Sequence, residues 1–406
     1  MIDVIVIGGG ASGLLAAIYA AKGNKKVLLL EKNNICGKKI LITGNGKCNY
    51  FNEDQNLTHY HASHPKFISN MITDQNIKEI LSFFDQLGII PKIKDGYYYP
   101  YSGQATSIQT TLIKEAEVLG VEIICNQEVL SIDYQNYFKI YTQNKIYLSK
   151  KVIISTGSKA YPKTGSTGFG YDLLKDIGHT INPVLPALVQ LKGRENYFKE
   201  WHGIRTDVKL TLIENQKETD KQIGEIQLTD YGISGICTFN LSGQVAIGLL
   251  EKKQEQIKIN FLYPFQLYTK EDFIAWMNKR NKKMKKRTIS DLLDGILNYK
   301  LINLLLKLSN IKKEMAWEQI SLSLKEKLGT NLTNFIVDIV ETNSFSQAQT
   351  CTGGVPLTEI HHTMESKIQK NLYITGELLD AYGDCGGYNL TLAWITGMIA
   401  GKEASK

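Results

Sequence analysis

The sequence has no apolar run long enough to cross a membrane. A spanning helix needs about 20 mostly apolar residues, and no segment approaches that length. The residues before the first glycine are apolar apart from Asp3 and have no basic leader, so they do not resemble a secretory signal. We therefore expect a cytoplasmic protein without membrane contact.

Cysteine is scarce and irregularly placed. The six cysteines stand at positions 36, 48, 125, 237, 351 and 385, and no Cys-x-x-Cys pair occurs. This pattern argues against a disulfide framework and against a zinc site, and it suits a reducing compartment. The histidines supply no metal-ligand spacing either, so we expect no metal and a surface or core position for each of His61, His179, His202, His361 and His362.

Proline is also scarce, with 8 in 406 residues, and 21% of the residues are charged. This composition excludes a disordered or collagen-like chain, and roughly 150 residues per domain predicts two or three domains. The net charge is +7, and residues 279–287, from Lys279 to Arg287, hold seven basic residues and no acidic one. Any argument for a polyanionic partner therefore rests on this segment, which we call the basic run.

A glycine motif follows the first expected strand. Residues 3–7 are continuous and apolar after Asp3, which is typical of a buried parallel strand. Next come Gly8-Gly9-Gly10-Ala11-Ser12-Gly13, an expected helix at 14–22, and a second strand at 26–30 that ends before Glu31. In this context Gly8 permits the tight turn, Gly10 admits a pyrophosphate and Gly13 lets the helix pack on the strand. Because Glu31 can accept from a ribose hydroxyl, the segment predicts a dinucleotide site.

The far end of the chain favours FAD over NAD. Residues 371–377 form an expected strand that ends in glycine and acid, and an expected helix at 391–400 follows Gly386-Gly387-Tyr388-Asn389-Leu390. A third expected strand, at 152–157, ends in Thr156-Gly157. A C-terminal strand, turn and helix that return to the N-terminal fold suit a long cofactor, with helix-start amides facing the pyrimidine end of the flavin. The predicted nucleotide domain is therefore discontinuous.

Five motifs in order carry a resemblance to a known family. They are residues 37–49 (GKKILITGNGKCN), 161–168 (YPKTGSTG), 231–235 (YGISG), 352–355 (TGGV) and 386–389 (GGYN). The chain resembles the bacterial BaiN/RdsA flavoproteins, also described as NAD(P)/FAD-dependent oxidoreductases of the aminoacetone-oxidase type. Lys47 stands where that family usually has arginine, so it lacks arginine's bidentate contact, and Asn45 stands where many members have glycine.

The resemblance implies an α/β fold, a glutathione-reductase-like Rossmann-type FAD-binding domain with a β-rich insert and a helical insert. We place the FAD-binding domain at residues 1–190 and 353–406. Segments such as 208–213 alternate with period two, and we place the β-rich insert at 191–265 and 345–352. The spacing across 270–341 is helical, and we place the helical insert at 266–344.

The predicted FAD-binding residues come from these motifs. They are Gly8, Gly10, Ala11, Ser12, Gly13, Glu31, Lys32, Lys39, Thr43, Gly44, Asn45, Cys48, Asn49, Val129, Thr156, Gly157, Gly376, Glu377, Asp380, Gly387, Tyr388, Asn389 and Leu390. Cys48 has two interpretations, a catalytic thiol beside the flavin or a small packing group, and the second is favoured.

The resemblance implies hydride transfer to a conjugated C=C bond. Family members reduce a uridine of 23S ribosomal RNA to dihydrouridine, or enone-like bonds of steroidal acids. No second strand-GxGxxG-helix unit occurs, so NAD(P)H is expected to bind transiently as electron donor. An acid must also protonate the substrate, and the candidates are Cys385, Asp384, Tyr388 and Tyr161, each with positioning or packing as the alternative.

The substrate and partner remain open at this point. The basic run favours 23S rRNA, because lysine and arginine grip phosphates, although a solvated helix face is the alternative. The four tyrosines of residues 97–101 (YYYPY), which we call the aromatic run, offer stacking surfaces or, more simply, packing. Reduction of a small enone, oxidation of a small amine, and a non-catalytic FAD-containing RNA-binding protein are the other hypotheses. The sequence leaves the oligomeric state undecided.

Overall fold

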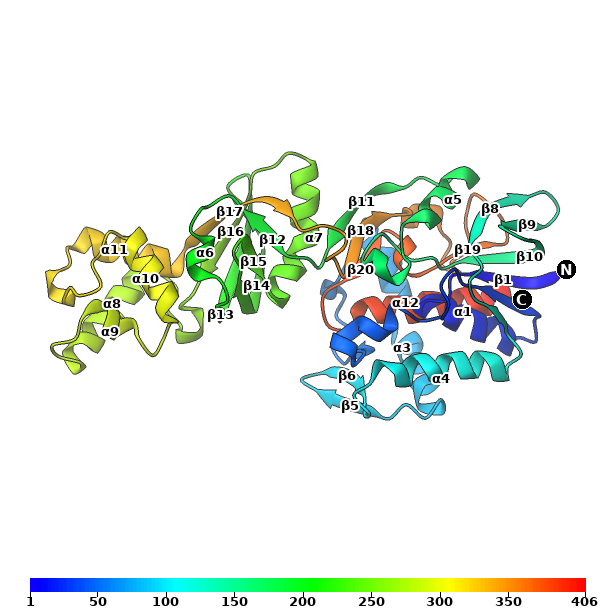
Figure 1. The fold of residues 1–406 in the computed structure, drawn as a ribbon, viewed down its shortest axis with the longest axis horizontal. Helices are drawn as coiled ribbons and strands as arrows, with labels where there is room; N and C mark the ends of the chain where they lie inside the picture. The colour runs from blue at the N-terminus through cyan, green and yellow to red at the C-terminus, as the bar shows by residue number, and fades with distance from the viewer. The chain divides into compact units, whose positions relative to one another are not determined.

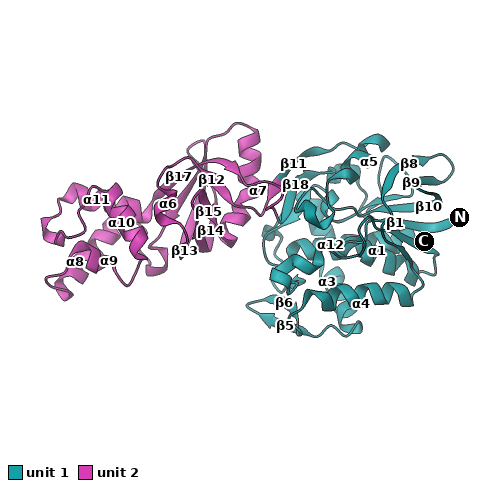
Figure 2. Ribbon diagram, in the orientation of Figure 1, with its two compact units in different colours: residues 1–185, 349–406 teal, residues 186–348 magenta.

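The computed structural model describes residues 1–406 and forms two compact units. The first unit comprises Met1–Leu185 and Gln349–Lys406, and the second comprises Pro186–Ala348 (Figure 2). No helix has both the length and the apolar character needed to cross a membrane.

A seven-stranded sheet forms the centre of the first unit (Figure 1). Its order is β7 (Glu122–Ile124), β2 (Val27–Leu30), β1 (Ile2–Ile7), β10 (Ile146–Ile154), β9 (Phe138–Thr142) and β8 (Val129–Tyr134), with β19 (Leu372–Ile374) beside the C-terminal half of β10. The pairs from β7 to β10, and β10 with β19, are parallel, whereas β8, β9 and β10 form an antiparallel meander. The predicted Rossmann-type architecture is confirmed.

Two helices from opposite ends of the chain pack together on this sheet. These are α1 (Ala11–Lys22) and α12 (Tyr388–Ala404). A Cβ at Gly397 would collide with the Ser12 carbonyl, and one at Gly401 with the Ala16 carbonyl, so glycine allows the two helix backbones to approach closely. The C-terminal helix is thereby fixed beside the glycine motif, as the discontinuous domain requires.

Shorter elements complete the first unit. The helices are α2 (Pro65–Met71), α3 (Asp74–Gln86), α4 (Ala105–Val118) and α5 (Phe169–Ile177). The additional strands are β3 (Phe51–Asn52), β4 (Tyr60–Ala62), β5 (Pro91–Lys94), β6 (Tyr97–Pro100), β11 (Asn182–Ala187), which runs into the second unit, β18 (Thr350–Gly354) and β20 (Ala381–Gly383).

A closed barrel forms the β part of the second unit. Its order is β12 (Leu191–Gly193), β15 (Gly232–Ser234), β14 (Lys217–Leu228), β13 (Arg205–Glu214), β16 (Glu255–Asn260) and β17 (Phe335–Thr342). Strand β17 lies where the sequence analysis expected helix, and its buried Phe335, Val337 and Ile339 alternate with more exposed residues. The helix α7 (Ile236–Leu250) was not expected inside the β-rich stretch.

Helices occupy the stretch between β16 and β17. They are α8 (Lys270–Lys283), α9 (Ile289–Leu293), α10 (Tyr299–Leu308) and α11 (Leu322–Thr333), while the short α6 (Phe198–Trp201) precedes β13. Buried side chains of the barrel and of these helices belong to one hydrophobic core. The division of this unit into a β-rich and a helical insert stays a proposal based on sequence segments.

The barrel buries one carboxylate without a partner. Glu255 on β16 is 2% exposed, both of its side-chain oxygens lack a hydrogen bond, and it lies opposite Glu214 on β13. Burial, together with the charge of Glu214, raises the pKa of Glu255 from 4.5 to about 7. The folded state therefore favours the protonated form of Glu255. The fold has its full stability below pH 4.5, and part of that stability is lost as the pH rises through about 7.

Glu255→Gln should therefore stabilise the second unit at alkaline pH. We expect a gain of about 3 kcal/mol at pH 8, since each pKa unit corresponds to about 1.4 kcal/mol, and almost no gain at pH 4. Urea unfolding followed by tryptophan fluorescence measures this, because three of the four tryptophans lie in this unit. The exposed Glu314→Gln is the matched control, and an equal or lower stability of the Glu255 variant at pH 8 would contradict the prediction.

Candidate functional site

The glycine motif connects β1 to α1 with almost no room for side chains. Gly8 has φ +99°, and a Cβ there would lie 2.6 Å from the carbonyl oxygen of Ser155. A Cβ at Gly13 would collide with the carbonyl oxygen of Gly8. Two of the glycines are therefore required by the protein's own packing.

Gly10 differs from these two positions. A Cβ at Gly10 would meet no protein atom within 4 Å, and its φ of −77° suits any residue. No side chain caps α1, which begins at Ala11, so the N–H groups of its first turn are available to an anion. The open space at Gly10 and these donors fit the pyrophosphate of a dinucleotide.

Glu31 is held beside the motif at the end of β2. Its carboxylate accepts from the backbone N–H of Gly9 at 2.8 Å, and from the backbone and side-chain nitrogens of Asn33 at 2.7 Å each. The side chain is buried and in a fixed orientation, and a carboxylate has further acceptor capacity for a ribose hydroxyl. The neighbouring Lys32 donates to Thr167 at 3.4 Å.

Lys39 and Glu377 were predicted separately as cofactor residues, and the structure brings them together. Lys39 Nζ lies 2.8 and 2.7 Å from the two carboxylate oxygens of Glu377, and Ser158 donates to the same carboxylate at 2.6 Å. Tyr171 OH donates to the backbone oxygen of Glu377 at 2.9 Å. Asp380, in the same turn, accepts from Asn182 at 2.7 Å. These contacts connect the loop after β2 to the turn after β19.

The predicted residues of the loop after β2 lie in a strained turn. Gly44, Asn45 and Cys48 all have left-handed backbone angles, with φ of 55°, 53° and 56°. The Cys48 side chain is fully buried, and burial raises the pKa of its thiol to about 12. A thiol with this pKa is neutral at physiological pH, which favours the packing interpretation over a catalytic thiol.

The remaining predicted residues of this loop and of the sheet edge show varied environments. Thr43 donates from its hydroxyl to the carbonyl of Ile40 at 2.7 Å. Val129 is buried at the start of β8, and the hydroxyl of Thr156 is buried without a partner at the end of β10. The Asn49 side-chain amide donates to the carbonyl of Phe51 at 2.9 Å.

The start of α12 repeats the arrangement at α1. Gly387 has φ +98°, a Cβ there would lie 2.8 Å from the Phe51 backbone, and no side chain caps the helix. The Asn389 amide accepts from the Gly383 N–H at 2.9 Å and donates to the Gly383 carbonyl at 2.7 Å. The turn before α12 is therefore fixed, and the first-turn N–H groups, from Tyr388 to Leu390, can face an electron-rich group.

Asp384, in that turn, contacts two histidines. Its carboxylate oxygens lie 3.0 Å from His59 Nδ1 and 2.8 Å from His61 Nε2, and the other ring nitrogen of His59 lies 3.1 Å from Asp54. His59 was not among the residues predicted from sequence, and His61 was expected only at a surface or core position. Their two-residue spacing gave no signal, because His59 ends the 3₁₀ turn Leu57–His59 whereas His61 lies on β4.

The other three candidate acids have different surroundings. Burial raises the pKa values of the Cys385 thiol and the Tyr388 phenol, so both groups hold their protons tightly. Tyr161 has a left-handed backbone, with φ 52°, and starts the short turn Pro162–Thr164.

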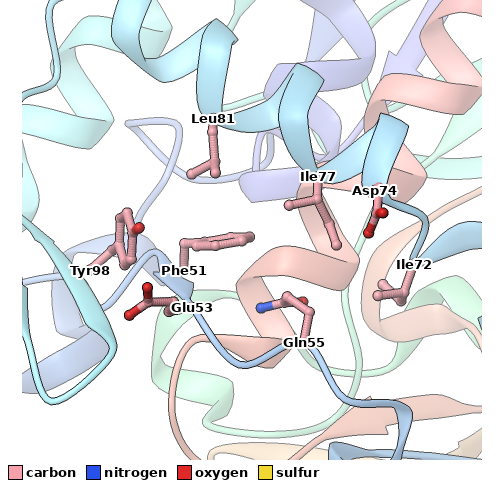
Figure 3. Close-up of a pocket in the computed structure, with 8 residues that line it drawn as sticks. All are labelled: Phe51, Glu53, Gln55, Ile72, Asp74, Ile77, Leu81 and Tyr98. Carbon is pink, nitrogen blue, oxygen red and sulfur yellow. The ribbon is translucent and has the colours of Figure 1, made fainter.

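A cavity of about 400 Å³ adjoins this region (Figure 3). Ile77 and Leu81 from α3 line one side, and Phe51 and Tyr98 from β3 and β6 line the other. Tyr98 also packs edge-on against Phe51, with ring centres 5.3 Å apart. This member of the aromatic run thus has a packing role, and none of the predicted site residues lines the cavity.

The basic run lies in the second unit, at the end of α8 and in the turn that follows. Arg280 is structural, since its guanidinium donates to the carbonyl of Leu292 at 2.7 Å and stacks on Trp276. The other six basic side chains are exposed and form no ion pair: Lys279, Lys282, Lys283, Lys285, Lys286 and Arg287.

Comparison with known proteins identifies the family. Residues 2–403 match the family described as HI0933-like protein Rossmann domain. The 3-dehydro-bile acid delta(4,6)-reductase of Clostridium scindens is 39% identical over 405 residues, which cover 99% of this chain and 98% of that protein. Proteins named ribosomal RNA dihydrouridine synthase are 27% identical in Haemophilus influenzae and 25% identical in Escherichia coli, over 99% of this chain and 98% and 97% of theirs.

These matches confirm the resemblance that the five sequence motifs indicated. They agree with the sheet order, the open space at Gly10 and the two uncapped helix starts. The chain therefore belongs to the HI0933-like family and is a Rossmann-type, FAD-dependent oxidoreductase.

Proposed function

We propose that this enzyme reduces a conjugated C=C bond with electrons from NAD(P)H. The observation that carries the proposal is the shared chemistry of its relatives, because a bile acid reductase and two dihydrouridine synthases match nearly the whole chain. A steroid dienone and the uracil ring of a uridine both contain a C=C bond conjugated with a carbonyl group. Both accept a hydride and a proton.

Each part of the site has a task in this reaction. The α1 N-terminus and Gly10 would bind the pyrophosphate, and Glu31 would accept from the ribose. The first-turn N–H groups of α12 would stabilise negative charge on the flavin. A bound flavin supplies hydride-transfer chemistry, and NAD(P)H binds transiently, since the sequence holds one dinucleotide motif. Asp384 and its neighbours belong to the proton-transfer part of the site.

The favoured substrate is a uridine of 23S rRNA in the cytoplasm. Six exposed, unpaired basic side chains at the basic run support this choice, because such groups bind phosphates in a salt-dependent way. A stacked base must leave its stack before a flavin can reach it, and phosphate contacts at the basic run would hold the RNA during that step. The second candidate is a small enone, which the 39% identity to the bile acid reductase favours.

Mass spectrometry of 23S rRNA from a strain lacking this protein tests the choice of substrate. We expect a uridine with two additional hydrogen atoms to disappear and to return on complementation with the intact gene. Complementation with a Gly13→Ala variant, whose Cβ collides with the glycine turn, should not restore it. Unchanged RNA in the deletion strain would exclude the ribosomal substrate and leave the small enone.

A further inference from the structure

At the turn before α12, acids and histidines alternate in a hydrogen-bonded series: Asp54, His59, Asp384 and His61. Strand β4 pairs with β20 so that His61 lies opposite Tyr382, and their rings stack with centres 4.7 Å apart. The ring of His59 stacks on Tyr388 at 4.6 Å. Between the two histidines lies Asp384, whose side chain is 7% exposed and whose backbone N–H donates to the carbonyl of His59. Aromatic stacking and pairing of β4 with β20 therefore fix both imidazole rings.

His59 is the histidine of this series that has a carboxylate at each ring nitrogen. Both of its ring nitrogens lie within hydrogen-bond distance of a carboxylate, from Asp384 and from Asp54, and only the doubly protonated ring donates to both. Burial disfavours the charged ring, but the hydrogen bonds to Asp384 and Asp54 outweigh it and raise the pKa of His59. The charged His59 ring thus lies against the buried carboxylate of Asp384.

His61 is the histidine of this series that has a carboxylate at only one ring nitrogen. Its Nε2 donates to Asp384 at 2.8 Å, its Nδ1 has no partner in the structure, and its side chain is 32% exposed. An imidazole with one nitrogen on a buried carboxylate and the other open has the arrangement of a general acid and base. We propose that His61 is the proton donor of the reduction, and that Asp384 and His59 are positioning residues that orient it.

This inference rests on the proposed function and names the source of the proton that the reduction requires. Reduction of C=C adds one hydride and one proton. A bound flavin would supply the hydride with its two electrons to the carbon β to the carbonyl, and NAD(P)H would restore the reduced flavin. The proton leaves Nδ1 of the doubly protonated His61 ring for the α carbon, and solvent then re-protonates the neutral ring. Asp384 stabilises the charged ring before the transfer and keeps the remaining proton on Nε2 afterwards.

Several other titratable groups surround His61 and are weaker candidates. The groups on the elements around it are Asp54, His59, Tyr60, Tyr97, Tyr382, Asp384, Cys385 and Tyr388. The phenols of Tyr60, Tyr97 and Tyr388 and the thiol of Cys385 have raised pKa values because of burial. Such groups release a proton less readily than an imidazolium does.

His61→Gln in the holoenzyme tests the proposal directly. The glutamine amide can keep the hydrogen bond to Asp384 but cannot carry a proton to the substrate. We expect normal FAD content and normal anaerobic flavin reduction by NAD(P)H. Re-oxidation of the reduced enzyme by the C=C acceptor should slow by about 100-fold or more.

His362→Gln is the matched control. The ring of His362 also stacks on an aromatic side chain, Phe67, at 5.0 Å, but it contacts no carboxylate, so its replacement should leave both half-reactions unchanged. If wild-type enzyme is re-oxidised by the acceptor and His61→Gln matches it, the proton-donor role is wrong while the proposed function stands. If wild-type enzyme is re-oxidised by no C=C acceptor, the proposed function fails first.

A spectroscopic measurement tests the geometry without turnover. Nitrogen NMR of histidine-labelled holoenzyme should show a proton on His61 Nε2, held by Asp384, and protons on both ring nitrogens of His59. Asp384→Asn should disturb the His61 tautomer and slow re-oxidation by about tenfold or more, with FAD content retained. A His61 tautomer that is unaffected by Asp384→Asn would overturn the positioning role, even if His61→Gln failed to fold.

Discussion

Gly10→Ala is expected to remove flavin from the enzyme while leaving the fold intact. The added Cβ meets no protein atom within 4 Å, so the apoprotein has no reason to be destabilised. The methyl group instead occupies the space in which the pyrophosphate approaches the N–H groups of α1. Loss of two charge-assisted hydrogen bonds, each about 1.5–3 kcal/mol, weakens FAD binding by about 100-fold or more.

Gly13→Ala is the matched substitution three residues along the same turn. Its Cβ collides with the carbonyl oxygen of Gly8, so we expect loss of folded protein as well as loss of flavin. Circular dichroism and the ratio of flavin to protein absorbance separate the two outcomes. A Gly10→Ala enzyme that keeps its full flavin content would contradict the placement of the pyrophosphate at this turn.

Neutralising the basic run should weaken RNA binding and reduce its salt dependence. The variant replaces four exposed lysines by glutamine: Lys282, Lys283, Lys285 and Lys286. Each phosphate contact contributes roughly 0.7–0.9 to the slope of log affinity against log salt. Loss of four contacts should therefore lower that slope by about 3, while the rate of flavin reduction by NAD(P)H stays the same.

A control with the same change of net charge isolates the effect of position. It replaces four other exposed lysines of the second unit by glutamine: Lys199, Lys252, Lys312 and Lys313. Binding to 23S rRNA fragments across a salt series should distinguish the two variants. Equal affinity and equal slope for both would remove the basic run from the account of the substrate and favour the small enone.

The parts of the fold that sequence predicts best are those set by local pattern. The glycine turn, the strands on both sides of it and the α12 region follow from residue types at fixed spacing. The strand β17 was missed because its period-two pattern follows directly after amphipathic helices, and β17 is recognisable only as the strand that closes the barrel. The helix α7 was missed because polar and apolar residues alternate in its first half, at 238–242, so that no clear helical face shows.

The site residues likewise fall into two groups, those that a local motif predicts and those that only the fold brings together. Gly10 and Glu31 follow from one local motif, whereas the contact of Lys39 with Glu377 joins residues 338 positions apart. Asp384 was a candidate acid on its motif alone, but its histidine partners lie 323 and 325 positions away and adjoin it only through pairing of β4 with β20. No pattern within a single segment carries that information.

The most direct test of the central claim is a single turnover under anaerobic conditions. Holoenzyme is first reduced with one equivalent of NAD(P)H, and it is then mixed with either a uridine-containing 23S rRNA fragment or a steroid dienone. The account predicts that one acceptor restores the oxidised flavin spectrum and gains two hydrogen atoms per flavin by mass spectrometry. Flavin that NAD(P)H reduces but only oxygen re-oxidises would contradict the account.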